Sequence, residues 1–585
     1  MKKIRKAAIA IALVIATGIQ GTAFAAGVPD EQFVITNPLT DDRHTGIKLA
    51  DVNFSVDSIS MLEAFTADGT TRDSRILTKI QCQKIGDVGC ESDKYFQYNA
   101  LLGLCDSTLT TNCVAEVFAT NSAGKRVVGK FVENFPGKTS YTYPGDASVG
   151  LPTGASSFIV DFPEMPHAGG TTYLVVAYMQ GARGFGQAKF ELENFNSAIF
   201  AVSKVSGSFS MPRPEMNIRP DHKIGGRQLT AGGFSSDQSV NRRSACVKTA
   251  PSECAVAWPM PLDVSFGYTL KMTEKIKGWF HGRLFDAQAE IISSTDGQQL
   301  LTVQGKPSLI PGIFAWFKKD AYPAPLKNYY ATQSEVSVNT NGLGWPSNSG
   351  VSNGADGLPY SIMKEGFGYD EGGFREVSAW IDAVGDKATY AQSVWSIRSM
   401  ESQQYGNCMK GSDSLSGIVT TNSTMYIGSP PVFNQAEQTL DYKVMSPHYL
   451  PDGSEFKGSY DLLIKSDVAR CVYGFSDAPI SASVSIISSD GTSQVATTVV
   501  GERGGWLTLA AKGFTFSAPI VRVKLSQKAD PAPAKVDPAP AKVDPAPVAA
   551  PKPAAKKTTI SCVKGKTVKR VTAVKPACPS GFKKK

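Results

Sequence analysis

Short apolar runs separated by Gly, Pro, Asn and Asp fill the N-terminal third of the chain. Two of these runs, residues 158–162 and 172–178, are rich in the aromatic and β-branched residues that strands favour. The pattern predicts an all-β domain over 26–210. Two prolines within 211–215 predict a boundary there, because proline resists both a helix and a central strand.

An internal repeat with an offset of 192 residues follows this domain. It is carried by Tyr268, Leu270, Met272, Ile276 and Gly282, which recur as Tyr460, Leu462, Ile464, Val468 and Gly474. The sequence 291–297 also recurs as 486–491, and its Asp-Gly step predicts a hairpin because glycine accepts the positive φ of a tight turn. The repeat predicts two related β-sandwich domains over 211–320 and 426–526; chance recurrence of common residues is the alternative.

The segment between the two copies, 321–425, has a different pattern and predicts an α+β insertion. Trp395 and Ile397 alternate with polar residues as in a strand, and 339–359 is a long Gly-, Asn- and Ser-rich stretch. Apolar residues at three- and four-residue spacing predict one amphipathic helix: Phe374, Val377, Trp380, Ile381 and Val384.

After Gln527 the chain repeats Asp-Pro-Ala-Pro-Ala-Lys-Val, which predicts an extended proline-rich linker over 527–558. Residues 559–585 form a small basic module that is too short to fold without a staple. The expected fold class is therefore mainly β: a multidomain tandem β-sandwich of immunoglobulin-like or jelly-roll type, with one small helical insertion, a Pro-rich linker and a short disulfide-stapled tail.

The first 25 residues read as a secretory signal peptide. Four basic residues precede an apolar stretch over 7–19, and Ala23-Phe24-Ala25 supplies the small residues of a cleavage site. We expect cleavage after Ala25, no transmembrane segment afterwards, and a secreted protein that is extracellular or associated with the cell wall. An uncleaved membrane anchor is the alternative.

Ten cysteines in an exported chain indicate disulfides, because the compartment is oxidising. Three pairs stand eight residues apart, two cysteines share the tail, and the remaining two are left to pair over a longer range. The expected pairs are Cys82 with Cys90, Cys105 with Cys113, Cys246 with Cys254, Cys408 with Cys471, and Cys562 with Cys578. Metal binding is the competing use, but the chain has no Cys-x-x-Cys pair and five scattered histidines, so we expect no metal site.

Charge is distributed unevenly along the chain. The signal contributes four positive charges and residues 549–585 contribute eleven with no acidic residue, so the net charge of +8 leaves −7 on the body between them. A basic tail on an acidic body predicts attachment to an anionic cell-wall polymer or polysaccharide, and not to nucleic acid; a merely solvated terminus is the alternative. The residues expected to attach the chain to the envelope are Lys564, Lys566, Lys569, Arg570, Lys583, Lys584 and Lys585.

The tail sequence from Ile560 to Lys585, ISCVKGKTVKR followed by KPACPSGFKKK, resembles a C-terminal motif of many secreted actinobacterial proteins. The body is similar to a set of large uncharacterised exported proteins of the same bacteria, with 278–283 (GWFHGR) and 466–475 (SDVARCVYGF) as the points of likeness. The resemblance implies export and surface retention. It brings no assigned chemistry, so no catalytic residue is carried over.

Two places in the body are candidate ligand sites. Trp279, His281 and Arg283 would share one face of a strand, where an indole beside a guanidinium could stack on a sugar ring and bind its hydroxyl or carboxylate groups. Trp345 in the Gly-rich stretch is the second candidate. The alternative for both is packing of the aromatic side chain in the interior.

Catalytic motifs are weak or missing in the sequence. Ser361 fits Ser-x-x-Lys without its companion motifs, and no Gly-x-Ser-x-Gly, His-Glu-x-x-His or dinucleotide-binding glycine turn occurs. Asp370 and Glu371 are adjacent, so on a strand they would point to opposite faces and make a poor acid and base pair. We therefore expect no catalytic residue and no cofactor.

The function expected from the sequence is that of a secreted, surface-associated, non-enzymatic β protein with an adhesive, structural or glycan-binding role, retained by its basic tail on an anionic envelope. A secreted enzyme acting on polysaccharide is one alternative, and converging carboxylates within 321–425 would favour it. A surface subunit that self-assembles through sheet edges is the other.

Overall fold

A computed structural model provides the structure of the chain. The residues it describes are 44–49, 59–66, 78–137, 142–206, 223–224, 227–228, 246–250, 253–294, 297–318, 323–331, 362–365, 370–400, 408, 415–476, 480–487, 493–495, 497–516, 520–527, 558–565, 567–573 and 575–585. The expected signal peptide at 1–25, residues 528–557 of the expected linker, Trp345 and Ser361 lie outside these residues.

The chain divides into two compact units, Met1–Lys528 and Ala529–Lys585. We call the first unit the body, and we call residues 558–585 of the second unit, which follow the linker, the module. The division falls at the start of the proline-rich repeat, where the sequence predicted a linker. Each unit is described by itself.

Strands make up most of the described structure, and three helices are present, so the prediction of a mainly β fold with few helices is confirmed. The strands of its N-terminal part are β1 (His44–Leu49), β2 (Met61–Thr66), β3 (Thr78–Cys82), β4 (Tyr95–Leu101), β5 (Cys113–Thr120), β6 (Arg126–Val128), β7 (Lys130–Asn134), β8 (Phe158–Asp161), β9 (Thr172–Arg183) and β10 (Glu191–Ser206). The strands of its middle part are β11 (Lys223–Ile224), β12 (Arg227–Gln228), β13 (Cys246–Ala250), β14 (Glu253–Trp258), β15 (Ser265–Met272), β16 (Gly278–Ser293), β17 (Gln299–Lys318), β18 (Ile362–Glu365) and β19 (Tyr390–Ser399).

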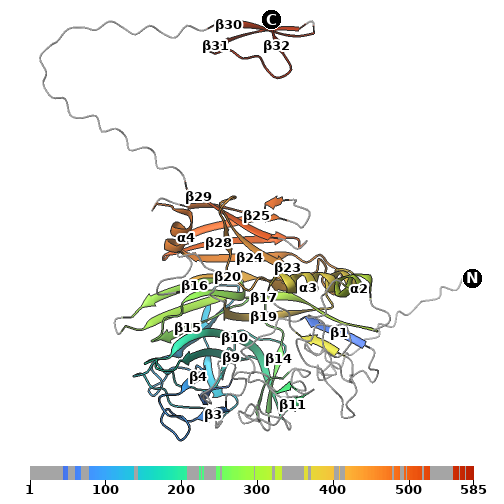
Figure 1. Cartoon of the computed structure of the whole chain (residues 1–585). Helices are drawn as coiled ribbons and strands as arrows, with labels where there is room; N and C mark the ends of the chain where they lie inside the picture. The colour runs from blue at the N-terminus through green and yellow to red at the C-terminus, as the bar shows by residue number, and fades with distance from the viewer. Residues whose placement is uncertain are drawn as a thin grey trace, which may run out of the picture. The chain divides into compact units, whose positions relative to one another are not determined.

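The last part of the body contains ten further strands and one of three described helices. These strands are β20 (Leu415–Thr421), β21 (Met425–Tyr426), β22 (Val432–Asn434), β23 (Thr439–Met445), β24 (Gly458–Lys465), β25 (Ile480–Ile487), β26 (Ser493–Val495), β27 (Thr497–Arg503), β28 (Trp506–Phe514) and β29 (Ile520–Gln527). The helices are α2 (Ala324–Ala331), α3 (Glu371–Ala383) and α4 (Ser466–Tyr473). Strands β24 and β28 lie between the long strands β16 and β17 and the sheet that contains β25 and β29 (Figure 1).

The two longest strands of the body, β16 and β17, change partners along their length. The first half of β16 pairs with β19 and β20, and the second half pairs with β17 from Leu284 onward. The register of β16 shifts between Phe285 and Gln288, which marks a β-bulge at the change. Strand β17 pairs with β15 and β16 first, then with β19 and β1. These strands therefore join sheets that the sequence pattern assigned to different domains.

The expected boundaries at residues 210, 320 and 425 are each crossed by strand pairing. Strand β5 pairs with β15, and β10 pairs with β14, across the first boundary. Strands β16 and β17 both pair with β19 across the second, and β20 pairs with β24 across the third. The four regions assigned from the sequence thus share sheets and lie in one compact unit.

The two copies of the internal repeat have the same structure in their first strand and differ after it, where the first copy carries the predicted ligand residues. Strands β15 and β24 each bury the three repeated apolar residues, and both Asp-Gly sequences join antiparallel pairs, β16 with β17 and β25 with β26. Beyond Met272 the chain turns into β16, whereas beyond Ile464 it forms helix α4. Gly474 ends that helix in a left-handed conformation, while its counterpart Gly282 lies inside a strand.

Helix α3 confirms the amphipathic pattern read from the sequence. Its buried face carries Phe374, Val377 and Trp380, which pack in one core with Leu49, Ile313 and Leu326. Asp370 caps the first turn by accepting a hydrogen bond from the Gly373 backbone N–H at 2.9 Å. The predicted strand with Trp395 and Ile397 is β19, and both side chains are buried.

Four of the five expected disulfides are present as predicted: Cys82 with Cys90, Cys105 with Cys113, Cys408 with Cys471, and Cys562 with Cys578. Cys254 is disulfide-bonded as well. The side chain of its expected partner Cys246 lies outside the described residues.

The module is a three-stranded antiparallel sheet in the order β31, β30, β32, with β30 (Thr558–Lys564), β31 (Thr567–Ala573) and β32 (Lys583–Lys584). Cys562 on the central strand is the one buried side chain among its described residues. The Cys562–Cys578 disulfide thus takes the place of a hydrophobic core, as the sequence predicted for so short a segment.

Candidate functional site

The predicted ligand residues of the body lie in β16 and are shielded from solvent. Trp279 and His281 are each 1% exposed and Arg283 is 2% exposed. Trp279 packs in one core, while Phe280 and Leu284 pack in another, so the strand alternation read from the sequence is correct. These three side chains form no exposed stacking platform, and the packing alternative describes them.

A buried cluster of cationic and aromatic groups surrounds Tyr426 instead. The imidazole of His281 stacks on the Tyr426 ring, with centroids 3.3 Å apart and planes 6° apart. The guanidinium carbons of Arg283 and Arg398 lie 4.6 and 4.9 Å from the centre of the same ring. One phenol ring therefore contacts three nitrogen-bearing side chains, which is a cation–π arrangement of the kind that stabilises desolvated arginine.

Arg283 is held in this cluster by backbone carbonyls at the end of β20 and just after it. Its guanidinium donates to the carbonyl oxygen of Thr421 at 3.1 Å and to that of Ser423 at 2.7 Å. Burial, followed by the charges of Arg283 and Arg398, holds the pKa of His281 well below its ordinary value. The imidazole is therefore neutral at neutral pH, and the cluster serves packing and strand connection.

A second polar cluster lies at the bulge of β16, and the sequence patterns did not single it out. Asp461 of β24 is 2% exposed, and its Oδ2 accepts from the backbone N–H of Ala287 at 3.3 Å and from the Thr420 hydroxyl at 3.4 Å. Burial raises the pKa of Asp461 to about 6. A lone acidic residue inside the apolar run Tyr460 to Ile464 was the available signal.

The partly exposed Asp286 lies in the same bulge, at a positive φ of 56°. It pairs with Lys512, and Lys306 lies 3.6 Å from its other carboxylate oxygen. Lys512 also lies over the Phe285 ring at 4.2 Å. The two lysines balance the charge of Asp286, and these ion pairs hold the bulge in place. Because Asp461 is buried beneath the bulge, a substrate has little access to its carboxyl group.

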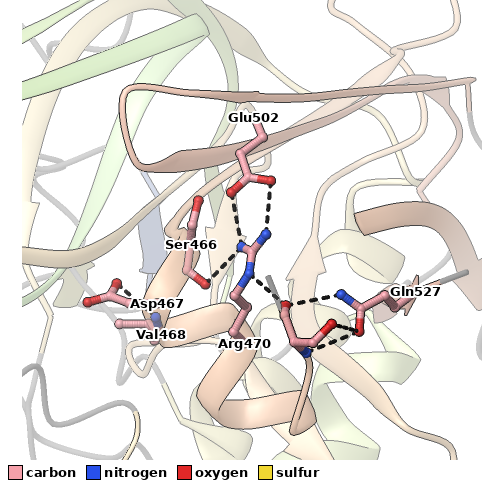
Figure 2. Close-up of polar contacts among 7 residues, drawn as sticks. Ser466, Asp467, Val468, Arg470, Glu502 and Gln527 are labelled. Atoms are coloured by element: carbon pink, nitrogen blue, oxygen red, sulfur yellow. Dashed lines mark hydrogen bonds and ion pairs between the residues drawn. The ribbon is translucent and has the colours of Figure 1, made fainter. Parts of the chain in front are cut away.

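Helix α4 carries the sequence 466–475 and is fixed to the body on several sides. Figure 2 shows the guanidinium of Arg470 directed at both carboxylate oxygens of Glu502 on β27, with nitrogen to oxygen distances of 2.9 and 3.3 Å. Arg470 also donates to the carbonyl oxygen of Ser476 at 2.9 Å, and Gln527 binds Ser476 in turn. These contacts and the Cys408–Cys471 disulfide hold helix α4 against the body, so the 466–475 motif has a structural role.

A pairing of His448 with Asp386 resembles the orienting half of a catalytic triad, but its bonds point to a structural role. Both oxygens of Asp386 are used, one by the imidazole Nδ1 and the other by the His448 backbone N–H at 2.9 Å. Tyr449 adds two backbone bonds to the same segment, with Asp386 and Ala388. The pair therefore docks the loop after β23 on the end of α3.

The described residues contain no group of three or more His, Cys, Asp or Glu side chains arranged to hold a metal ion. Asp370 is used as the helix cap, and Glu371 pairs with Lys443. Within the same residues, no helix is both long and apolar enough to cross a membrane.

The module carries many exposed charges of one sign. One of the seven predicted attachment residues, Lys566, lies outside the described residues. The other six are all exposed: Lys564, Lys569, Arg570, Lys583, Lys584 and Lys585. The sequence of the module has no acidic residue to neutralise them. Such a surface can bind the oxyanions of carboxylate, phosphate or sulfate groups.

No known protein-family model and no curated protein sequence matches this chain. The resemblance of its tail and body to exported actinobacterial proteins remains a prediction.

Proposed function

We propose that the chain is an exported, non-enzymatic β protein whose basic module holds it on an anionic cell envelope. The single observation that carries this proposal is the module itself: a disulfide-stapled sheet whose described basic residues are exposed and whose sequence has no acidic residue. Its excess of positive charge attracts polyanions over a distance of about 10 Å at moderate salt. The four described disulfides are compatible with an oxidising, extracellular setting.

The body supports the non-enzymatic part of the proposal through the roles of its polar clusters. Asp461, whose pKa is shifted most toward neutrality among the described carboxyl groups, is buried under a bulge and not placed in an open site. His281 is enclosed between a tyrosine ring and two arginines. Groups with shifted pKa values mark catalytic sites when they line a cleft, and here both groups are buried where strands meet.

Binding to isolated cell walls freed of nucleic acid tests the proposal. The chain 26–585 is compared with a chain that ends at Gln527, which keeps the whole described body as its own compact unit. We expect the longer chain alone to bind and to be released as salt rises from about 50 to 500 mM, because salt screens exposed charges. Equal binding of both chains at high salt would contradict the proposal and move recognition to the body.

A further inference from the structure

The register of the module sorts its basic residues onto two faces. Opposite residues of antiparallel strands share a face, and successive residues of one strand alternate between faces. Lys569 and Lys584 both lie opposite Cys562, so these three residues share one face. Arg570 lies opposite Ser561, and Lys583 lies opposite Val563, so these four residues share the other face.

The face that carries Cys562 is covered by the end of the chain. Its disulfide with Cys578 draws the segment after β31 over this side of the sheet. Phe582 precedes Lys583 and so lies on this face, and Lys569 places its ammonium group 5.5 Å from the Phe582 ring. We call this the covered face; its basic residues are Lys564, Lys569 and Lys584.

The opposite face is open. Val568 on β31 is 57% exposed there, and Arg570, Lys583 and Lys585 are exposed. Lys585 joins this face because its backbone N–H donates to the carbonyl oxygen of Ser561 at 2.9 Å, which continues the pairing of β32 with β30.

The cations of the open face flank its central strand. Arg570 stands on β31 and both lysines stand at β32, while β30 between them presents the uncharged residues Ser561 and Val563. Adjacent strands are roughly 4.8 Å apart, so the two rows of cations are separated by about 10 Å. Lys583 and Lys585 are two residues apart on one strand, which spaces them by about 7 Å along the row.

We propose that the open face binds a linear anionic polysaccharide lying along β30, with its charged groups held from both sides by Arg570, Lys583 and Lys585. The inference rests on the proposed function and assigns it to one face and one class of ligand. A flexible polymer with repeated carboxylate groups can reach both rows, and the guanidinium of Arg570 suits a planar carboxylate.

The composition of the open face favours a polymer over the two other anionic partners. A nucleic acid strand is usually bound by stacking of its bases on aromatic side chains, and Phe582, the module's aromatic residue, lies on the covered face. A membrane surface is usually bound with large apolar or aromatic anchors, whereas the open face offers two valines.

Two matched triple variants of the full chain test the inference. The open-face variant is R570Q/K583Q/K585Q, and the covered-face variant is K564Q/K569Q/K584Q. Each removes three positive charges and leaves both cysteines in place, and an intact disulfide is verified by mass spectrometry. Binding to polygalacturonate, a linear polysaccharide with one carboxylate per sugar, is measured at low salt, with anionic phosphatidylglycerol vesicles as a second probe.

We expect the open-face variant to weaken polygalacturonate binding about tenfold, and the covered-face variant to weaken it by a factor of about 2, because only long-range attraction is lost. Equal losses for both variants would overturn the assignment to a face and leave the basic module as the attachment site. Stronger open-face-dependent binding to the vesicles would overturn the choice of polymer. If the unaltered chain bound neither probe nor cell walls, the proposed function itself would fail.

Discussion

The two units of the chain use their positive charges in opposite ways. In the body, Arg283 is enclosed by a tyrosine ring and backbone carbonyls, and Lys512 and Arg470 pair with carboxylates. In the module, Arg570 and the lysines face solvent without any acidic residue in the same segment. A desolvated cation must be satisfied inside the protein, so truncating it destabilises the fold. An exposed cation stabilises little and remains available for a partner.

The largest expected effect is the loss of the buried Arg283. R283A leaves the carbonyls of Thr421 and Ser423 without their donor and opens a cavity beside Tyr426. We expect the free energy of unfolding of the body to fall by about 3–5 kcal/mol. R283M, which keeps the volume of the side chain, should recover part of this loss. Denaturant titration of the full chain measures both variants.

The matched change in the module is R570A, which should alter the stability of either unit by less than about 0.5 kcal/mol. A loss of several kcal/mol from R570A, or no loss from R283A, would break the contrast between buried and exposed arginines.

The next effect concerns the disulfides, which the two units need to different degrees. In the module, Cys562 is the only buried described side chain, so C562S/C578S should unfold it; a loop of this length contributes about 3 kcal/mol. In the body, Leu104 and Val114, the chain neighbours of Cys105 and Cys113, belong to or pack against a large hydrophobic core, so C105S/C113S should leave the strands folded.

Hydrogen exchange measured by mass spectrometry on the full chain separates the two outcomes. We expect peptides of 558–585 to lose protection in the first variant, and peptides of β5 and β15 to keep it in the second. A protected module without its disulfide would show that its sheet is stable on other grounds.

Local features of this fold could be predicted from the sequence, and long-range ones could not. The face of α3, the two Asp-Gly hairpins and the close cysteine pairs involve residues near each other in the chain, where periodicity and spacing act directly. Pairing of β5 with β15 joins residues about 150 positions apart, and no local pattern specifies it. Strand β16 changes partners at a β-bulge, which no local pattern marked. Because of this change, residues predicted to form a separate domain share a sheet with β19 and β20.

The candidate sites divide in the same way. The exposed residues of the module could be predicted, because a cysteine-stapled basic segment without acids has nothing to bury its charges against. The burial of Trp279, His281 and Arg283 required Tyr426 and Arg398, which come from distant strands. Asp461 was missed because alternation marks an acidic residue as exposed unless both faces of its strand are covered.

A smaller effect comes from Asp461 and His281, two buried titratable groups of the body. Their contributions to the free energy of unfolding should change in opposite directions with pH. The raised pKa of Asp461 means that its folded form binds the proton more tightly, so its contribution to stability is largest below pH 4 and is lost as pH rises toward 6. The lowered pKa of His281 means that its contribution is present above pH 6.5 and is lost as pH falls.

Removing the carboxyl group should therefore change stability in a pH-dependent way. We expect D461N to match the unaltered chain near pH 4 and to exceed it by up to about 2 kcal/mol at pH 7. Hydrogen bonds from Ser454 lower the pKa of the exposed Asp452, so D452N should show the opposite sign of pH dependence. Unfolding curves recorded from about pH 2 to 7 follow both variants, because the contribution of Asp452 is lost only below about pH 4. A pH-independent effect of D461N would exclude Asp461 as a buried titrating group.

The smallest effect is expected at the ion pair between Arg470 of α4 and Glu502. Arg470 is intermediate in exposure between the buried Arg283 and the exposed Arg570. The side chain of Arg470 is 15% exposed and that of Glu502 is 36% exposed, so the ion pair is partly screened by solvent. The hydrogen bonds from Arg470 lower the pKa of Glu502, which places the carboxylate in its charged form at neutral pH. A double-mutant cycle with R470Q and E502Q should give a coupling energy of about 1 kcal/mol or less, falling at high salt. A coupling energy of several kcal/mol that does not fall with salt would show that Arg470 behaves like the buried Arg283. A coupling energy of zero would mean that the Cys408–Cys471 disulfide and the Tyr473 hydrogen bond hold the helix without the ion pair.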